Sequence, residues 1–527
     1  MAICSRIRMH IQSPGKKILE EKEPVFRNSK EAVVTRPECL GHRYEDHKIR
    51  MTAVQWNYLV AFIYDLFGDV LKWAEGCDAD MEGAGIEEHF FASLRRLFQT
   101  HAAGLASEML SCMDTGNVGR RLGCSKCGGT MTYRGNREIT ILTCLGNVTL
   151  HRAYYTCDTS GCSETVFPLD VKLGIDEHRA LPGMGDLIAR LCAEMSYETA
   201  MEVLGDVIGK DNAPCVRMAE EVCWDIAKDI KEEETGEVYE AFQNPLGSRL
   251  PAVEEHSDML ALTVDGTCVP TGAKEEFHEA KLGVISQIGE IHEDRDGALV
   301  SDLVNHRYTV HVGNADDFFE RYLMECARCG AFEAKRLVLM GDGAPWIWNR
   351  FREHFGDAGM ETVEILDFWH CMEHVADAGE LVYGTKSAKW NEKRKKELLE
   401  GRLRSFFAAL SWGVAYVKSR NDGESLAKLL QEIEYFKNHR GRMEYSRYRR
   451  EGLPIGSGVV EGGCKHVIKD RTCRSGMRWS VNGCEAILKI RAKLKSKRWG
   501  RFRDSQWKQC RDNFRRLQNS ALSRKAA

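Results

Sequence analysis

Three carboxylates stand where the sequence places the ends of apolar runs or a loop of small residues. Asp265 and Asp342 each follow a short apolar run and precede a glycine. An acid at the carboxyl end of a strand lies at the rim of an α/β sheet, where such sheets build their sites. Glu461 is the only acid within residues 452–469, a basic stretch. Three carboxylates can hold two Mg²⁺ ions for phosphodiester chemistry; the alternative for Glu461 is an ordinary ion-paired glutamate.

Further groups with possible roles follow these acids. Asp367 and His370 end a strand-like run that begins at Thr362, so they could orient the edge of the sheet beside the carboxylates. The alternative is a histidine whose ring is satisfied next to an aromatic core. Trp346 and Trp348 follow Asp342. An indole can stack on a nucleic-acid base, and core packing is the alternative for at least one of them.

Four cysteines have a spacing that is typical of a zinc site. Cys124 and Cys127 lie in a turn flanked by glycines, and Cys157 and Cys162 follow a strand-like run. Two such pairs, separated by strands that resemble a hairpin, suit a tetrahedral Cys4 zinc ribbon. Four ordinary buried thiols are the alternative. The sequence therefore predicts one structural zinc ion, bound by these four side chains.

The segment that follows Glu461 is rich in cations. If residues 459–470 form a helix, Lys465 and Lys469 lie on the same face as Glu461, which would place phosphate-binding groups beside a metal ligand. Contacts of lysine and arginine with phosphates dominate the affinity of proteins for DNA. The residues that we expect to contact DNA are Lys465, Lys469, Arg471, Arg474, Arg478 and Trp346.

The charge of the chain is divided along its length. The 527 residues have a formal net charge of only −4. Residues 385–527 contain 36 Lys and Arg against 14 Asp and Glu, a net charge of +22, and the residues before them carry −26. A basic segment of this size favours a polyanionic partner. The alternative is that the two parts of the chain neutralise each other.

Composition places the chain among globular proteins. Hydrophobic residues make up 43% and charged residues 29% of the sequence, as in soluble domains. No apolar run approaches the roughly 18 residues that span a membrane, and residues 1–17 lack the apolar core of a signal peptide. We therefore expect a cytoplasmic protein without a membrane partner, in which the 20 cysteines stay reduced.

Periodicity predicts a multidomain α/β chain. The pattern indicates an irregular arm over 1–50, a helical region over 51–115, a zinc-ribbon-like module over 116–172 and helices over 173–250. The last of these ranges has the layout of a helix-turn-helix, although its acidity makes a purely structural helical pair an equal alternative. A mixed sheet follows over 258–370, then a helical segment over 371–450, a glycine-rich loop and basic helix over 451–500, and a basic tail over 501–527.

Several of these stretches together resemble the Kra-type bacterial insertion-sequence transposases, which belong to the DDE superfamily and have an RNase H-like catalytic core. The resemblance extends from about Cys124 to Trp499. The N-terminal matches are Gly146–Cys157 and Phe167–Asp170, and the longer, more specific matches are Gly341–Trp346, Leu366–His370, Leu453–Gly462 and Arg474–Trp479.

The resemblance implies a role for each candidate residue. Asp265, Asp342 and Glu461 fall on the catalytic triad of the family, which binds Mg²⁺ or Mn²⁺, and Asp367 and His370 fall on its Asp-x2-His signature. It also implies an RNase H-like mixed sheet with an all-helical insertion over 371–450. A zinc-ribbon-like module and a helical DNA-binding region would precede this core.

The implied activity is DNA transposition. Such an enzyme binds the terminal inverted repeats of its element, cuts phosphodiester bonds and joins the 3′-OH ends to target DNA. Because two ends must be brought together, we expect a homo-oligomer, associated with the bacterial nucleoid while it is bound to DNA. Two alternatives remain open at this point: a domesticated DNA-binding protein without catalysis, and a metal-dependent nuclease that hydrolyses DNA without strand transfer.

Overall fold

The chain forms two compact units. The computed structural model describes residues 31–34, 49–75, 92–113, 115–244, 247–272, 276–293, 299–356, 359–474 and 476–522. The first unit is drawn from residues 1–188, 198–218 and 504–527, and the second from 189–197 and 219–503. Within the described ranges, no helix is both long enough and apolar enough to cross a membrane.

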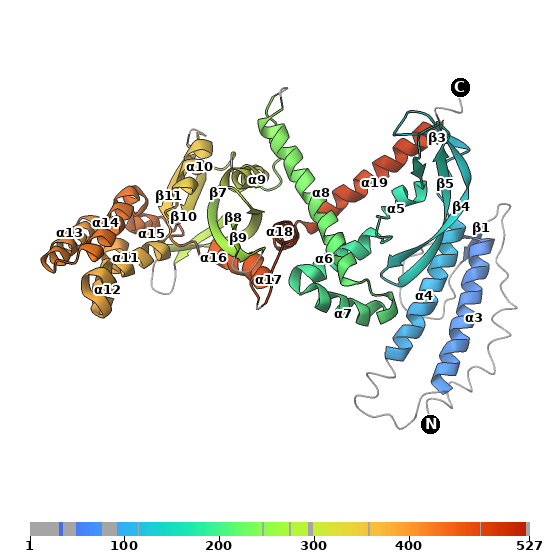
Figure 1. Cartoon of the computed structure of the whole chain (residues 1–527), viewed down its shortest axis with the longest axis horizontal. Coiled ribbons are helices and arrows are strands. Elements are labelled where there is room, and N and C mark those ends of the chain that lie inside the picture. Colours follow the sequence, from blue (N-terminus) through green and yellow to red (C-terminus); the bar gives the residue numbers. More distant parts are fainter. Residues whose placement is uncertain are drawn as a thin grey trace. The chain divides into compact units, whose positions relative to one another are not determined.

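The first unit is built on a four-stranded antiparallel sheet (Figure 1). Its order is β3-β4-β5-β6, with β3 Arg121–Gly123, β4 Thr130–Thr143, β5 Gly146–Cys157 and β6 Thr165–Val166. Apolar side chains on one face of β4 and β5 pack against Ala103, Ala106 and Leu110 of helix α4. Helices α3 Ala53–Glu75, α4 Ala92–Met113 and α5 Pro168–Leu173 complete this part.

The N-terminal prediction holds in part. Helices α3 and α4 account for the helical region expected over 51–115. Within the expected irregular arm, β1 Glu31–Val34 and β2 Ile49–Thr52 form an antiparallel pair, and the remaining residues of the arm lie outside the described ranges. The two strands are only four residues long, too short for periodicity to reveal them.

Helices occupy the range predicted to be helical over 173–250. They are α6 Pro182–Glu194, α7 Tyr197–Ile208 and α8 Val216–Phe242, with a short 3₁₀ turn η2 at Lys210–Asn212. The last of these helices, α8, is 27 residues long. Exposed positions of α7 include Glu202 and Asp206, and acidic side chains repel phosphates. The helical pair is present, but its exposed acids do not suit major-groove binding.

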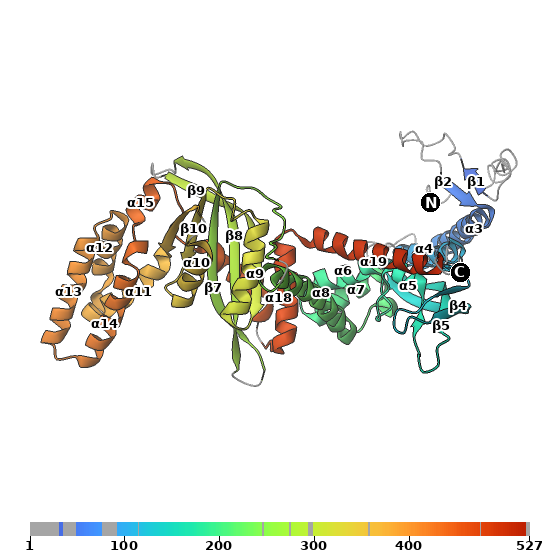
Figure 2. The same cartoon turned by 90° about the horizontal axis from the view of Figure 1, so that it is seen from above.

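The second unit contains a mixed five-stranded sheet (Figures 1 and 2). Strands β7, β8 and β9 form an antiparallel meander, and β10 and β11 run parallel to β7. The order is β11-β10-β7-β8-β9. The α/β expectation over 258–370 is confirmed by β7 Met259–Pro270, β8 Phe277–Glu293, β9 Leu299–Val312, α9 Ala315–Arg328, β10 Arg336–Gly341, α10 Pro345–Phe355 and β11 Glu361–Leu366.

The helical segment expected over 371–450 begins directly after β11. Its helices gather at one end of the second unit in both views (Figures 1 and 2). Buried rings such as Phe406 and Phe436 belong to the same hydrophobic core as the central strands. The helices are α11 Phe368–Tyr383, α12 Ala388–Leu399, α13 Leu403–Ser419, α14 Gly423–Asn438 and α15 Tyr445–Arg450, with short 3₁₀ turns η3 Gly384–Lys386 and η4 Arg440–Arg442.

The chain then returns to the sheet through a series of short and long helices. These are α16 Gly458–Gly463, the π-helical turn η5 Cys464–Lys469, α17 Asp470–Thr472, α18 Val481–Lys495 and α19 Trp499–Leu522. Helix α18 packs against β9. The basic tail expected over 501–527 is instead helical as far as Leu522, because α19 presents apolar residues such as Leu517 to the core of the first unit.

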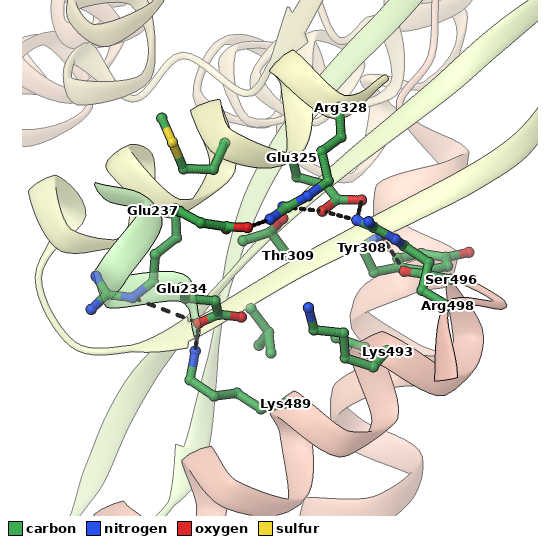
Figure 3. Close-up of a pocket in the computed structure, with 14 residues that line it drawn as sticks. Glu234, Glu237, Tyr308, Thr309, Glu325, Arg328, Lys489, Lys493, Ser496 and Arg498 are labelled. Carbon is green, nitrogen blue, oxygen red and sulfur yellow. Dashed lines mark hydrogen bonds and ion pairs between the residues drawn. The ribbon is translucent and has the colours of Figure 1, made fainter. Parts of the chain in front are cut away.

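Many cations of the basic segment are buried against acids from earlier in the chain. Figure 3 shows Lys489 of α18 paired with Glu234 of α8, at 2.5 Å, and Arg498 paired with Glu325 of α9, also at 2.5 Å. The cavity among these side chains, of about 20 Å³, has room for a single water molecule. The charge division of the sequence is therefore partly an internal neutralisation, and it indicates a polyanionic partner less strongly than its size suggests.

Glu485 provides a test of this ion-pair network. The side chain is 7% exposed, accepts from His311 Nδ1 at 2.7 Å and lies 3.2 Å from Lys231 Nζ. Burial opposes ionisation, but the hydrogen bond from His311 and the charge of Lys489 outweigh it and lower the pKa of Glu485 to about 2. The carboxylate thus stabilises the fold above its ordinary pKa of 4.5, and this contribution is lost as the pH falls toward 2.

We expect Glu485→Gln to lower the free energy of unfolding of the second unit by about 3 kcal/mol at pH 7, because it leaves buried cations without their partner. The measurement is urea unfolding followed by tryptophan fluorescence, and the difference from wild type should shrink below about pH 4.5. Glu232→Gln, at a side chain that is 68% exposed, is the control and should change stability by less than about 0.5 kcal/mol. Equal effects of the two variants would contradict the network.

Candidate functional site

Three aspartates lie level with one another on adjacent parallel strands. In the register of β7, β10 and β11, Asp342 comes directly after the last pair of β10 with both neighbours. Asp265 on β7 and Asp367 after β11 occupy the same level on either side of it. The carboxyl ends of parallel strands are where α/β sheets place their sites. The sheet thus brings together two of the three predicted catalytic acids and the predicted supporting acid.

Asp265 does not end its strand, contrary to the prediction. β7 continues to Pro270 because β8 goes on pairing with it beyond this position. The Asp265 carboxylate accepts from the Gly266 N–H at 2.7 Å and from the Cys464 thiol at 3.5 Å. Burial raises the pKa of Asp265, and the nearby charge of Asp342 raises it further. A half-buried acid that faces another acid is a group that a cation would stabilise.

Asp342 starts a loop that is closely covered by the helical segment. Its Oδ1 accepts from the Ala344 N–H at 2.8 Å, which fixes the turn into α10. A Cβ on Gly343 would clash with Tyr435 of α14 and would lie 3.0 Å from His439 Nε2. Burial lowers the pKa of His439 to about 4. Helix α14 therefore packs directly against the loop of this acid, and only glycine fits at position 343.

Asp367 connects both ends of the helical segment. Its side chain is 1% exposed. One oxygen accepts from the His370 N–H at 2.6 Å and caps α11, and the other accepts from the Ser457 N–H. The loop before Glu461 is therefore tied to the end of β11. The sequence predicted that Asp367 orients the edge of the sheet. Its two hydrogen bonds hold the start of α11 and the loop before α16 at the end of β11.

Glu461 lies on α16, which packs against the sheet through a glycine. A Cβ on Gly463 would lie 2.8 Å from Leu282 on β8, so the helix can approach β8 only without a side chain there. Glu461 itself is exposed. Burial of part of its carboxyl raises its pKa, and the charges of Asp367 and Asp265 add to this effect. The π-helical turn that follows is a feature often found at functional sites.

The three predicted catalytic acids influence one another without forming a tight cage. Among the described residues, the carboxylate oxygens of Asp265, Asp342 and Glu461 do not all lie within 4.8 Å of one another. Asp265 nevertheless raises the pKa of Glu461, and Asp342 raises the pKa of Asp265. A chain of repelling carboxylates is what a hard divalent cation would relieve. The donor set, all oxygen, fits magnesium or manganese in chemical type.

Two residues that the sequence analysis missed also face this site. Glu373 Oε2 lies 3.0 Å from His370 Nδ1, one turn further along α11, and the Cys464 thiol contacts Asp265. The i, i+3 spacing of His370 and Glu373 on a helix is a signal that could have revealed the first. Nothing in the sequence indicates that Cys464 would meet an acid almost 200 positions earlier.

Four of the cations predicted to bind DNA are exposed. Lys465 and Lys469 are exposed on the π-helical turn that follows the helix of Glu461. Arg474 and Arg478 are also exposed, and Arg474 Nε donates to the Asp470 carbonyl at 2.6 Å. These side chains remain candidates for phosphate contacts.

Arg471 contradicts the prediction of a DNA contact. It is 1% exposed, and its Nε donates to the Cys192 carbonyl at 2.8 Å. The guanidinium lies 4.6 Å from the ring centroid of Trp479 and 5.3 Å from that of Tyr197. Arg471 thus fixes neighbouring segments of the core and cannot reach a phosphate in this structure. Its two aromatic partners are distant in the sequence, so the spacing of cations alone did not reveal the burial.

The two tryptophans after Asp342 differ in exposure. Trp348 is 3% exposed, and the Arg442 guanidinium lies over its ring, 4.1 Å from the centroid of the indole. Trp346 is half-buried and packs edge-on against Phe318, with 6.2 Å between the ring centroids. Core packing therefore accounts for Trp348, and part of the Trp346 ring remains accessible.

The four predicted zinc ligands converge at one end of the sheet in the first unit. Their sulfur atoms all lie within 4.8 Å of one another. Cys127 Sγ is 3.5 Å from Cys157 Sγ, and Cys124 Sγ is 3.9 Å from Cys162 Sγ. The hydrogen bond between Cys127 and the Thr159 hydroxyl, and the one that Cys127 accepts from the Gly129 N–H, lower the pKa of Cys127 to about 6. These thiols form a group that could hold a metal such as zinc.

We expect about one zinc ion per chain by elemental analysis of purified protein. Cys127→Ser should reduce the zinc content severalfold, because a hydroxyl cannot replace a thiolate ligand. Cys144→Ser is the matched control, since Cys144 is exposed and lies outside the cluster, and it should retain the metal. Well-folded wild-type protein that contains almost no zinc would overturn the assignment.

Comparison with known proteins identifies the family of the chain. No curated protein matches the sequence. The model of an uncharacterised protein family matches residues 129–510. This range contains the five-stranded sheet, the four-stranded sheet except β3, and Asp265, Asp342 and Glu461, whereas Cys124 and Cys127 precede it. Since the match extends over most of the chain, the protein belongs to the uncharacterised protein family UPF0236.

Proposed function

We propose that this protein is a DNA transposase of the DDE type, related to the Kra-type insertion-sequence enzymes. It would bind the terminal inverted repeats of its element, cut the strands and join their 3′-OH ends to target DNA. The observation that carries the proposal is the level alignment of Asp265 and Asp342 on adjacent parallel strands. Glu461 comes from a distant segment of the chain. Because the charge of Asp265 raises the pKa of Glu461, we assign both carboxylates to one site.

The arrangement of the sheet supports an RNase H-like core. Three antiparallel strands are followed by two strands parallel to the first. Asp265 lies on the first strand of this series, and Asp342 directly follows the fourth. In the sequence, the helical segment lies between β11 and α16, the helix of Glu461. In this proposal, residues 258–370 and 451–500 are the two parts of the core, and α11–α15 are the insertion.

Asp265, Asp342 and Glu461 would hold Mg²⁺ or Mn²⁺. When bound, such ions supply activation of an attacking oxygen and stabilisation of the leaving oxygen. The three carboxylates would position the cation, and its positive charge would offset the repulsion between them. Asp367 ties the loop before α16 to the end of β11, and the charge of Asp265 raises the pKa of Glu461. His370, held by Glu373, lies beside the same acids.

The exposed cations beyond Glu461 would bind the phosphates of the DNA backbone next to this site. Lys465 and Lys469 follow Glu461 at intervals of four, and all three are exposed. Phosphates that contact these lysines would lie next to the carboxylates that hold the metal. Arg474 and Arg478 extend the same segment. The four-cysteine module would contribute to recognition of the inverted repeats, and joining two ends requires a homo-oligomer on DNA.

The acid Asp342 tests the proposed chemistry. Asp342→Asn should lower Mn²⁺-dependent cleavage of DNA that carries the flanks of the gene by on the order of 10³-fold, because a metal ligand is lost. Asp302→Asn is the control, at an exposed acid on β9 of the same sheet, and should change the rate less than about twofold. Undiminished cleavage by Asp342→Asn contradicts the assignment, and cleavage by wild type without joined products favours a nuclease.

Asp367 tests how Glu461 is positioned. Asp367→Ala leaves two buried N–H groups without acceptors, so we expect a loss of about 2 kcal/mol in stability together with most of the cleavage activity. Asp422→Ala removes another side-chain cap, that of α14, in which Asp422 accepts from Ser425. This control should cost about 1 kcal/mol and keep its cleavage activity. Cleavage lost equally in both variants would mean that stability alone is responsible.

A further inference from the structure

The helical insertion carries a stack of aromatic rings outside the carboxylate site. Trp412 and Tyr416 are nearly parallel, with 9° between their planes and 5.4 Å between their centroids. Tyr383 continues the stack, at 6.2 Å and 17° from Trp412 and at 6.1 Å and 23° from Tyr416. Trp390 adds a tilted ring beside Tyr383. These four residues are called the aromatic stack below.

Local structure explains how the rings meet. Trp412 and Tyr416 are four apart on α13 and therefore share one face of that helix. Tyr383 ends α11. A Cβ on Gly413 would lie only 2.9 Å from Val382 on α11, so the two helices can come this close only because position 413 has no side chain. The stack is thus a product of close packing between α11 and α13.

The aromatic stack is exposed, although the insertion contributes other rings to the hydrophobic core of the second unit. Trp412 is 55% exposed and Tyr416 is 39% exposed, whereas the nearby rings of Phe406 and Phe436 are fully buried. Large aromatic side chains gain most when they leave water. Two stacked rings that remain in water on a folded helix therefore provide flat faces for a partner.

The charge around the stack indicates an anionic partner. Helix α13 contains Arg404 and Lys418 and no acid, and both cations are exposed. Arg420, at its end, places its guanidinium 5.8 Å from the centroid of Tyr416 and also pairs with Asp422 at 3.8 Å. Lys386 and Lys389, exposed as well, lie beside Tyr383 and Trp390 in the sequence. Flat rings with cations around them suit nucleic-acid bases and their phosphates.

We propose that the aromatic stack binds unpaired bases of DNA. Bases in a duplex already stack on their neighbours, so only a separated or single strand offers its faces to Trp412 and Tyr416. Stacking of a base on an aromatic side chain contributes about 1–3 kcal/mol. The inference rests on the proposed function in one respect, namely that the substrate is DNA. It assigns to the insertion the task of holding a strand that has left the duplex.

The test compares single-stranded and duplex DNA on the full chain. Binding of a labelled oligothymidylate, and of a mixed-sequence duplex of equal length, is followed by fluorescence anisotropy. Trp412→Ala should weaken binding of the single strand about 10-fold, equivalent to about 1.4 kcal/mol, and change duplex binding less than twofold. Trp412→Phe should restore most of the affinity because it keeps an aromatic face. Tyr239→Ala, at a ring that is 47% exposed on α8, is the control and should leave both affinities unchanged.

Specific outcomes would overturn the inference. Unchanged binding of oligothymidylate by Trp412→Ala contradicts it, as does an equal loss for both DNAs. A change in the oligomeric state of Trp412→Ala, with single-strand binding intact, would assign the stack to contacts between copies of the chain and overturn it as well. The proposed function fails separately, since cleavage by Asp342→Asn is measured in another assay and this variant should still bind oligothymidylate.

Discussion

The buried carboxylate of Asp367 determines where the two distant parts of the second unit meet. One of its oxygens caps α11, where the helical insertion begins, and the other accepts from Ser457, where the insertion has ended. A carboxylate this deeply buried is stable only when its oxygens are hydrogen-bonded. The chain therefore leaves and rejoins the sheet at one point. The position of Glu461, four residues beyond Ser457, depends on that arrangement.

Charge within the second unit is arranged in two different ways. On the β9 side, Lys489 and Lys493 of α18 pair with acids of α8, and Arg498, just after α18, pairs with Glu325 of α9. Where β10 ends, Asp342 lies level with Asp265 of β7. Burial raises the pKa of Asp265, and the charge of Asp342 raises it further. Neutralised charge contributes to the fold, whereas the repulsion among acids is the property expected of a site that awaits a cation.

Much of this arrangement could be predicted from local sequence patterns. The apolar runs before Asp265 and Asp342 predicted strands of an α/β sheet, and the spacing of Cys124, Cys127, Cys157 and Cys162 predicted their convergence. The helical range 371–450 followed from periodicity. Each of these predictions depends on residues that are close in the sequence or on a pattern repeated along one element.

The parts that could not be predicted depend on partners far apart in the sequence. Arg471 was expected to meet DNA, and its burial depends on Tyr197, Cys192 and Trp479. The length of β7 depends on how far β8 continues to pair with it. In the same way, the neutralisation of Lys489 requires Glu234, 255 positions away. A single sequence contains no signal that identifies such pairs.

The central claim is that Asp265, Asp342 and Glu461 surround one divalent-metal centre. Iron(II) that replaces magnesium at such a centre, with ascorbate and peroxide, produces radicals that cut the nearby backbone. The account predicts cuts near residues 265, 342 and 461 in the same protein, and their loss when excess Mg²⁺ is added. Cuts that never occur near 461, or that Mg²⁺ does not suppress, would contradict it.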